Sequence, residues 1–214
     1  MNERTQVTRA RKKVSTDRSA LYELLDSAVL GHFALIHPDG HPVVLPTAIA
    51  RDGDRVLAHG STGSRWMRLL ADGAATCLAV TALDGFVVAR SAFESSMHYR
   101  SAVIFGQCSV VTEPASKDAA LDIVTEHLLP GRTQEIRHST RQELDATLVL
   151  SLPLDEWSLK VSDGWPDDPP EDVADDAWAG VVPLLLSCGT PQPTPDLADG
   201  IAVPPSVQRL GTSW

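Results

Sequence analysis

Two short segments of the sequence carry residue types that could bind an anionic cofactor. The first, HGSTGSRWMRLL (59–70), places small residues directly ahead of a predicted helix with an arginine in its first turn. Small residues let the backbone approach an anion, while helix N–H groups and an arginine complete a phosphate site. The alternative is an ordinary Ser-capped helix with a solvated arginine. The candidate cofactor-binding residues here are His59, Gly60, Ser61, Gly63, Ser64 and Arg65.

The second segment, ARSAFESSMHYRSAVIFG (89–106), gathers cationic and hydroxyl groups around a turn between two predicted strands. Such groups suit a phosphate, and a neighbouring aromatic side chain suits a flat ring system. The alternative is a polar hairpin whose arginines pair with nearby carboxylates, which would contribute little to stability. The candidates here are Arg90, Tyr99, Arg100 and Ser101, together with His98.

Histidines supply the remaining candidate chemistry. No nucleophile–base pair stands out, so His59 and His98 are the candidate catalytic proton donors. The sequence has no GxxxxGK[ST], no GxGxxG after a strand, no HExxH and no GxSxG. We expect no metal site, because the histidines show no metal-ligand spacing; His37 and His41 flank a turn and are interpreted as surface residues.

The composition is that of a globular protein. The 214 residues are 43% hydrophobic and 21% charged, which excludes wholesale disorder. No apolar run reaches the roughly 18 to 20 residues that a membrane span needs, and no secretory signal is evident. The three cysteines form no CxxC and no disulfide framework. We therefore expect a cytoplasmic protein without a membrane partner.

The net charge of −10 is unevenly distributed. Residues 1–20 hold six bases against two acids, so they carry +4 and the remainder carries −14. Seven acids and no bases lie between Asp163 and Asp176. Nucleic-acid contacts need clustered Lys and Arg, so we expect no nucleic-acid partner. The basic arm over residues 1–14 is interpreted as a solvated, frayed terminus.

Hydrophobic periodicity predicts an antiparallel protein that is mainly β with flanking helices. Strands are expected over 31–37, 41–51, 55–60, 75–83, 86–93, 100–113, 147–154 and 157–162, and helices over 16–29, 64–70, 116–129 and 140–146. Turn residues at 38–40, 52–54 and 84–85 predict hairpins. Short strands joined mostly by hairpins describe a small antiparallel barrel.

The composition changes beyond residue 160, where nine of the fifteen prolines lie. The apolar stretch 177–186 is expected to dock on the body, and 187–214 to form an extended or partly disordered tail. We therefore divide the chain into an arm (1–14), one domain (15–186) and a Pro-rich tail (187–214).

The order of elements and the two segments resemble the FMN-binding split barrels of the pyridoxamine 5'-phosphate oxidase-like superfamily. The nearest likeness is the flavin-nucleotide-binding and nitroimidazole-resistance-like branch, over about residues 8–186. The residues that carry it are Pro46-Thr47-Ala48-Ile49, His59-Gly60-Ser61, Gly63-Ser64-Arg65, Leu83-Asp84-Gly85, Ala89-Arg90-Ser91-Ala92-Phe93, Tyr99-Arg100-Ser101, Phe105-Gly106, Leu152-Pro153-Leu154-Asp155, Lys160-Val161 and Trp178-Ala179-Gly180.

This resemblance implies a six-stranded antiparallel split β-barrel that forms a homodimer with FMN at the subunit interface. It implies that the Gly63-Ser64-Arg65 turn grips the FMN phosphate and that Tyr99-Arg100-Ser101 faces the phosphate or ribityl chain. Pro46, Thr47, Ala48 and Ile49 would run along the isoalloxazine edge. Trp66 stands where the oxidases have a second base, which implies either a weaker phosphate affinity or a shift of the phosphate toward Arg90.

The resemblance favours an FMN-dependent oxidoreductase that acts on a small organic acceptor such as a nitro compound or a quinone. The alternatives are a non-catalytic FMN carrier and a haem-binding split barrel, in which His59 or His98 would be an axial ligand. Arg209-Leu210 lies in the Pro-rich tail, and the substrate-binding C-terminus of the true oxidases is missing. Pyridoxine phosphate is therefore a disfavoured substrate.

Overall fold

The computed structural model describes residues 3–5, 11–174 and 176–210. The strands are β1 (Val14–Ser15), β2 (Leu30–Ile36), β3 (Pro42–Asp52), β4 (Arg55–Ser61), β5 (Ala75–Val88), β6 (Ser96–Gln107), β7 (Ser109–Val110), β8 (Thr147–Pro153), β9 (Glu156–Ser162) and β10 (Gly180–Pro183). The α-helices are α1 (Arg18–Ser27), α2 (Arg65–Ala71), α3 (Pro114–Leu128), α4 (Arg141–Ala146), α5 (Pro170–Val173) and α6 (Pro205–Leu210). Short 3-10 helices are η1 (Glu3–Thr5), η2 (Arg11–Lys13) and η3 (Arg132–Gln134).

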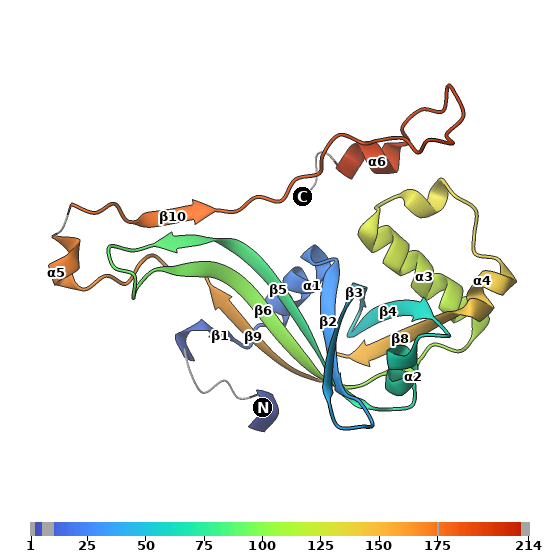
Figure 1. Ribbon diagram of the computed structural model, residues 1–214, viewed down its shortest axis with the longest axis horizontal. Helices are drawn as coiled ribbons and strands as arrows, with labels where there is room; N and C mark the ends of the chain where they lie inside the picture. Colours follow the sequence, from blue (N-terminus) through green and yellow to red (C-terminus); the bar gives the residue numbers. More distant parts are fainter. Residues whose placement is uncertain (1–2, 6–10, 175, 211–214) are drawn as a thin grey trace.

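The strands form one antiparallel sheet in the order β1-β9-β6-β5-β2-β3-β4-β8-β7, and β10 pairs with β5 (Figure 1). Consecutive hairpins such as β2–β3 and β3–β4 build this order from local turns. The predicted fold class is confirmed: the protein is mainly β, antiparallel and flanked by helices. The sheet is larger than the six-stranded barrel that the resemblance implied, with 10 strands in the described residues, and its described strand order does not close into a ring.

Two apolar clusters hold the sheet and the helices together. The larger lies where α1 and α2 cover the sheet, and the second lies under α3. Side chains alternate between the faces of a strand, so in β4 Val56 and Ala58 enter the first cluster while Leu57 enters the second. Strand β4 is thus buried from both sides. It positions the His59–Arg65 segment that follows.

Strand β5 corrects one prediction. Residues 84–85 do not form a hairpin turn, because β5 runs unbroken from Ala75 to Val88 with a register shift between Leu83 and Gly85. This shift is a β-bulge in the pairing with β6, and the connection between the strands comes later, over 89–95. A Cβ on Gly85 would lie 2.8 Å from the Val182 carbonyl oxygen. Glycine is therefore needed for β10 to approach β5.

The boundary around Pro114 also differs from the prediction. The strand expected over 100–113 is divided into β6 and the two-residue β7. Pro114 does not simply end a strand: it is in the first turn of α3, and the Glu113 carboxylate caps that helix by accepting from the Ser116 N–H at 2.7 Å. Proline suits this position because the first helical N–H has no intrahelical partner.

The described part of the N-terminal arm contacts the body, which corrects its interpretation as a solvated terminus. Val14–Ser15 pairs with β9, and Arg4 forms an ion pair with Glu156 at 3.5 Å. The Lys13 ammonium lies 5.6 Å from the centroid of the Tyr99 ring. Residues 1–2 and 6–10 of the predicted arm lie outside the described residues.

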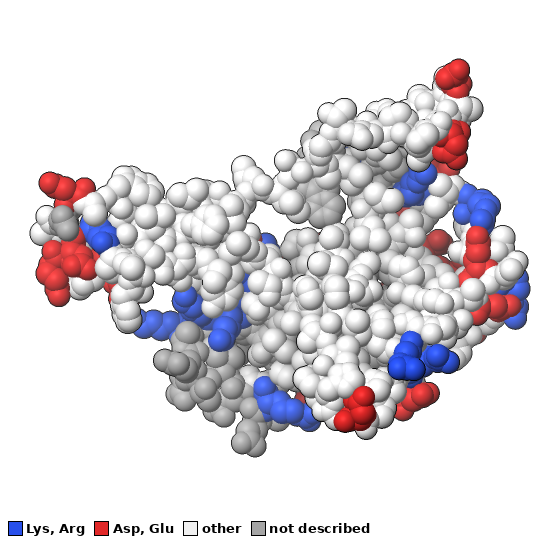
Figure 2. Space-filling view, viewed as in Figure 1, with Lys and Arg blue, Asp and Glu red and all other residues white. Residues whose placement is uncertain are grey.

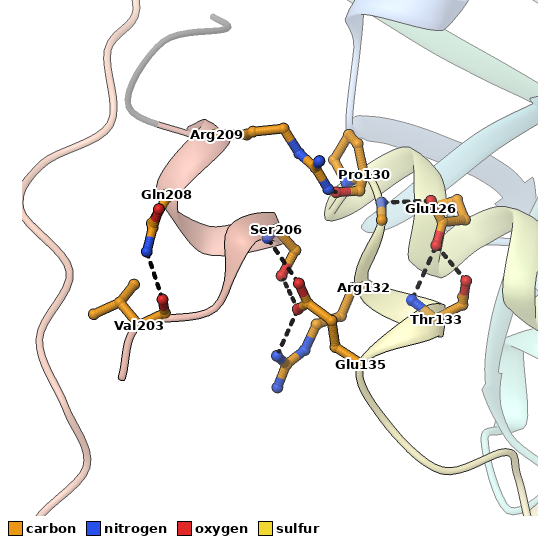
Figure 3. Close-up of polar contacts among 10 residues, drawn as sticks. Glu126, Pro130, Arg132, Thr133, Glu135, Val203, Ser206, Gln208 and Arg209 are labelled. Carbon is orange, nitrogen blue, oxygen red and sulfur yellow. Dashed lines mark hydrogen bonds and ion pairs between the residues drawn. The ribbon is translucent and has the colours of Figure 1, made fainter. Parts of the chain in front are cut away.

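The C-terminal segment returns to the body at two points. The predicted docking of 177–186 is confirmed for β10, which pairs with β5, but Leu185 and Leu186 are 91% and 74% exposed. Helix α6, which the sequence did not predict, docks beside α3 and η3 (Figure 3). There the Ser206 N–H and hydroxyl donate to the Glu135 carboxylate, and Arg209 donates to the Pro130 carbonyl at 3.1 Å.

The surface keeps the charge asymmetry expected from the sequence. Acidic side chains gather at the end of the molecule that holds α5, as Figure 2 shows in the same view as Figure 1. Among the described residues, no helix is long and apolar enough to cross a membrane.

Candidate functional site

The small-residue turn between β4 and α2 is tightly ordered by its own backbone. The Ser61 hydroxyl accepts from the Gly63 N–H at 3.1 Å, and the Ser61 carbonyl accepts from the Ser64 N–H at 2.9 Å. Thr62 donates through its N–H and its hydroxyl to the Ala146 carbonyl, at 3.0 and 3.2 Å. The turn is therefore fixed against the end of α4. A Cβ on Gly60 would clash with the sulfur of the buried Met67 side chain, which would then have to move.

Arg65 opens α2 at the end of this turn and has an exposed side chain. It forms no ion pair or hydrogen bond through its guanidinium with any described residue. Ser64 stands at the N-cap, but its hydroxyl makes no capping hydrogen bond. The Ser64 hydroxyl, the first N–H groups of α2 and the Arg65 guanidinium are thus all available to an anion. The structure brings these groups together as the sequence predicted.

Trp66 packs against the core, whereas the neighbouring Arg65 is exposed. It is partly buried against the larger cluster, and its ring centroid lies 6.1 Å from that of Phe33. The tryptophan at this position therefore anchors α2 to the sheet. Arg65 is the cationic side chain at the first position of α2, and Arg68 of the same helix donates from Nη2 to the Gly63 carbonyl at 3.4 Å.

The sequence predicted that Arg90 would be free to bind a phosphate, but in the structure it is paired with a carboxylate. Its guanidinium pairs with Asp168 at 2.9 Å, and its backbone N–H donates to the same carboxylate, also at 2.9 Å. The Asp168 side chain is only 2% exposed. The acidic run therefore supplies an internal partner for Arg90, which is the alternative that the sequence left open. One atom, Arg90 Nε, is buried without a partner in the described structure.

Arg100 also has a carboxylate partner. Its Nε and Nη2 atoms donate to the two oxygens of Asp84, at 3.1 and 2.9 Å, in a bidentate pair. This hydrogen-bonded pair raises the pKa of the Arg100 guanidinium above its ordinary value. The remaining nitrogen, Nη1, reaches the Ser27 hydroxyl at the end of α1 at 3.4 Å. Asp84 was quoted among the residues of the resemblance, but its role as the partner of Arg100 follows from the bulge in β5.

The other predicted cofactor residues lie in the sheet. Thr81 and Ser101 share a cross-strand hydrogen bond between their hydroxyls at 3.2 Å. Along β3, Pro46 is exposed at the pairing with β2, whereas Ile49 is 1% exposed and packs in the core. The Ile49 side chain is therefore directed away from any surface ligand. Thr47 and Ala48 are partly buried on the same strand.

His59 sits at the end of β4, directly before the turn, opposite Val149 of β8. Its Nδ1 atom is buried and has no partner among the described residues. Burial lowers the pKa of the imidazole below its ordinary value, because desolvation disfavours the charged ring. Burial thus favours the neutral form of the His59 imidazole, beside the candidate anion site. Neutral imidazole is the form that ligates metals.

His98 has a different environment. Its Nε2 atom lies 2.9 Å from the Gly164 carbonyl oxygen, so that ring nitrogen is already used to hold the segment after β9. The two candidate proton donors therefore differ: His98 is tied to the backbone, while His59 is not.

The two predicted segments do not meet within one subunit. Strand β6, which carries Arg100, is separated from β4 by β5, β2 and β3 in the sheet order. In the described part of the chain, no hydrogen bond or ion pair joins residues 59–65 to residues 98–101. Two hollows of about 430 and 590 Å³ lie elsewhere, one along β9 near Trp157 and one around Asp52 and Gln107. Neither is lined by a predicted cofactor residue.

The sequence and structure of this chain are similar to those of known proteins. Residues 17–161 match the family model described as pyridoxamine 5'-phosphate oxidase. The chain belongs to the pyridoxamine 5'-phosphate oxidase family. The match includes both segments, from His59 to Arg65 and from Arg90 to Ser101. A search of curated proteins finds no match.

Solved structures extend the likeness over nearly the whole chain. The FAD and heme binding protein from Mycobacterium smegmatis is 52% identical, with a TM-score of 0.89, covering 93% of this chain and 97% of its own. The flavocytochrome Anf3 from Azotobacter vinelandii is 33% identical, with a TM-score of 0.90 and coverage of 98% and 97%. A 5-nitroimidazole resistance-like protein from Bacteroides thetaiotaomicron shares the fold at 20% identity, with a TM-score of 0.59 and coverage of 69% and 86%.

Proposed function

We propose that this member of the pyridoxamine 5'-phosphate oxidase family is a flavin-binding redox protein that passes electrons to a small organic acceptor. The observation that carries the proposal is the 52% identity, over nearly both full lengths, to a protein named for binding FAD and heme. The unpaired Arg65 beside an ordered small-residue turn supports it, because this is the donor set that a flavin phosphate needs.

The relatives favour FAD over the FMN that the sequence resemblance implied, since the Mycobacterium smegmatis protein is named for FAD. Both cofactors carry a phosphate on the ribityl chain, so Arg65, Ser64 and the first N–H groups of α2 would serve either one. When bound, a flavin supplies electron- and hydride-transfer chemistry that no side chain can provide. The chain's own part is to bind the phosphate and orient the ring.

Haem binding is a second candidate, and a specific atom favours it. His59 Nδ1 is buried without a partner, while its other nitrogen, Nε2, makes no hydrogen bond to a described residue. A neutral imidazole with an unengaged nitrogen fits an axial haem ligand. His98 fits less well, because its Nε2 already lies against the Gly164 carbonyl. We therefore propose His59 as the axial ligand of a second cofactor.

We propose a homodimer in which each cofactor lies between two subunits. Since Arg65 and Arg100 do not meet within one chain, a second copy is needed if both act on one flavin. A row of half-exposed apolar side chains crosses three neighbouring strands, from Val182 of β10 through Phe86 of β5 to Met97 of β6. Contiguous apolar surface of this kind is typical of protein interfaces.

We also propose that the protein is located in the cytoplasm, since Cys77, Cys108 and Cys188 are free.

An absorption spectrum of the purified protein tests the cofactors directly. Two flavin bands, with a Soret band if haem is present, are expected, and mass determination of the released cofactor distinguishes FMN from FAD. A protein that binds neither flavin under reconstitution contradicts the proposal.

Anaerobic reduction followed by addition of a quinone or nitro compound separates enzyme from carrier: turnover supports the enzyme, and its absence supports the carrier. Sedimentation of a monomer that still holds flavin tightly would refute the shared site.

A further inference from the structure

The tip of the β2–β3 hairpin gathers three potential metal ligands: His37, Asp39 and His41. Their ligand atoms all lie within 4.8 Å of one another. His37 Nδ1 is 2.9 Å from Asp39 Oδ1, and His41 Nδ1 contacts the same oxygen. The two imidazole rings stack, with centroids 4.7 Å apart and planes inclined by 20°. Both rings therefore direct their Nδ1 atom toward the Asp39 carboxylate.

The backbone holds this arrangement in place. The ladder between β2 and β3 ends at the pair Ile36 and Pro42, and the His37 N–H continues it by donating to the His41 carbonyl at 2.9 Å. Cross-strand partners project from the same face of a hairpin, so the two histidines face one another. The Gly40 N–H donates to the His37 carbonyl at 2.8 Å, and Gly40 adopts a φ of +93° that glycine permits. The turn thus aligns two histidines that are four positions apart in the sequence, with Asp39 between them.

The donor set matches a borderline divalent transition metal. Two imidazole nitrogens and one carboxylate oxygen are ligands that zinc, nickel and copper accept, whereas calcium and magnesium prefer oxygen alone. In a tetrahedral zinc site with bonds of about 2.0–2.1 Å, ligand atoms lie roughly 3.3 Å apart. The ligand atoms at the hairpin tip, all within 4.8 Å of one another, already lie in the range of such a site. A fourth position would be left for water.

We propose that His37, Asp39 and His41 bind one divalent transition-metal ion, such as Zn²⁺, at the tip of the β2–β3 hairpin. Among the described residues, no hydrogen bond or ion pair joins His37, Asp39 or His41 to residues 59–65 or 98–101 of the proposed flavin site. An ion held by both strands would also join the two sides of the hairpin. The spacing of the histidines predicted no metal site; it is the turn geometry that brings the three ligand atoms of His37, Asp39 and His41 together.

Zinc titration of the full-length protein tests the site. The protein is stripped with a chelator, kept reduced and titrated with ZnCl₂ by calorimetry. The wild type is expected to bind one more Zn²⁺ per chain than the double variant His37→Ala/His41→Ala. Asp39→Asn, which keeps the histidines, is expected to weaken binding by about tenfold or more, in line with other metal-site substitutions. His138→Ala, a change to an exposed histidine elsewhere, should leave the titration unchanged.

Amide NMR gives a second readout that locates the ion. Zn²⁺ should shift the Asp39 and Gly40 resonances in the wild type and not in the double variant. Equal stoichiometry and affinity in the wild type and the double variant would overturn the proposal, as would the absence of shifts at the hairpin tip with Zn²⁺ in large excess. Far-UV circular dichroism shows whether each variant is folded. The flavin spectrum is expected to be the same in all of them, so this test is independent of the proposed redox function.

Discussion

The turn at Gly63–Arg65 and the region around β5 and β6 contain the same kind of cationic residue in opposite situations. Arg65 is exposed and forms no ion pair within the described structure. Arg90 and Arg100 each meet a carboxylate at 2.9 Å. An arginine without a partner in a protein of net charge −10 remains available to an external anion. A paired arginine stabilises the fold or sets the local charge.

The comparison shows that residue type alone does not identify a phosphate ligand. Both segments had arginines next to serines and a nearby aromatic residue, so they were equivalent in sequence. The difference lies in which carboxylates the fold places against them. Asp168 comes from a distant acidic run and Asp84 from the strand alongside, whereas no described carboxylate pairs with Arg65. The following predictions use this difference.

The largest expected effect is on stability, at Arg90 and Asp168. Asp168→Ala should lower the free energy of unfolding by about 3 kcal/mol, because it leaves a partly buried guanidinium without its partner. Urea unfolding followed by circular dichroism measures it. Arg65→Ala is the matched control and should leave the unfolding midpoint of the flavin-free protein unchanged. If the two variants have the same urea midpoint, the ion pair between Arg90 and Asp168 does not stabilise the fold.

The next effect is on flavin affinity, at Arg65. Charge-assisted hydrogen bonds contribute roughly 1.5–3 kcal/mol, so Arg65→Ala should weaken flavin binding by about tenfold to a hundredfold. Fluorescence titration of the stripped protein with FAD and with FMN measures this loss. Arg51→Ala removes an arginine that is paired with Asp26 and lies outside both segments, and it should have no effect. Unchanged affinity in Arg65→Ala would mean that the phosphate lies elsewhere.

Arg100 is expected to matter less and by another route. Two of its nitrogens are used by Asp84, so Arg100→Ala should reduce flavin affinity chiefly by uncovering that carboxylate, by less than about tenfold. The double variant Arg100→Ala/Asp84→Asn should then recover most of the affinity. If the double variant binds as weakly as the single one, Arg100 contacts the flavin itself. In that case an arginine's pairing with a carboxylate does not predict whether it binds the flavin.

The smallest effect is a pH dependence of stability at His59. Its folded-state pKa is lowered by burial, so the unfolded chain takes up a proton more readily than the folded protein. The stability contributed by neutral His59 is present above the unfolded value of about 6.5 and is lost as the pH falls through the folded pKa. His59→Gln should therefore show a smaller loss of stability between neutral and mildly acidic pH. His138→Gln, an exposed control, should keep the wild-type slope.

The elements that depend on local pattern were predicted well from the sequence. Period-two alternation and turn residues located the strands from β2 to β4, and helical spacing with capping residues located α1, α3 and α4. Asp17 caps α1 by accepting from the Ser19 N–H at 2.9 Å, and Thr140 forms a capping box with Glu143. These features arise between residues within four positions of one another. The small-residue turn before α2 belongs to the same class.

The tertiary structure decided the features that depend on distant residues. The Asp84–Gly85 pair has turn-forming residues, yet it forms a bulge because β10 and β6 pair with both edges of β5. The partners of Arg90 and Arg100, the docking of α6 on Glu135 and the unpartnered Nδ1 of His59 follow from the same long-range packing. Local sequence sets backbone preference through sterics and short-range hydrogen bonds. The partner of a charged side chain depends on which strands the sheet places beside it, and a local pattern does not contain that information.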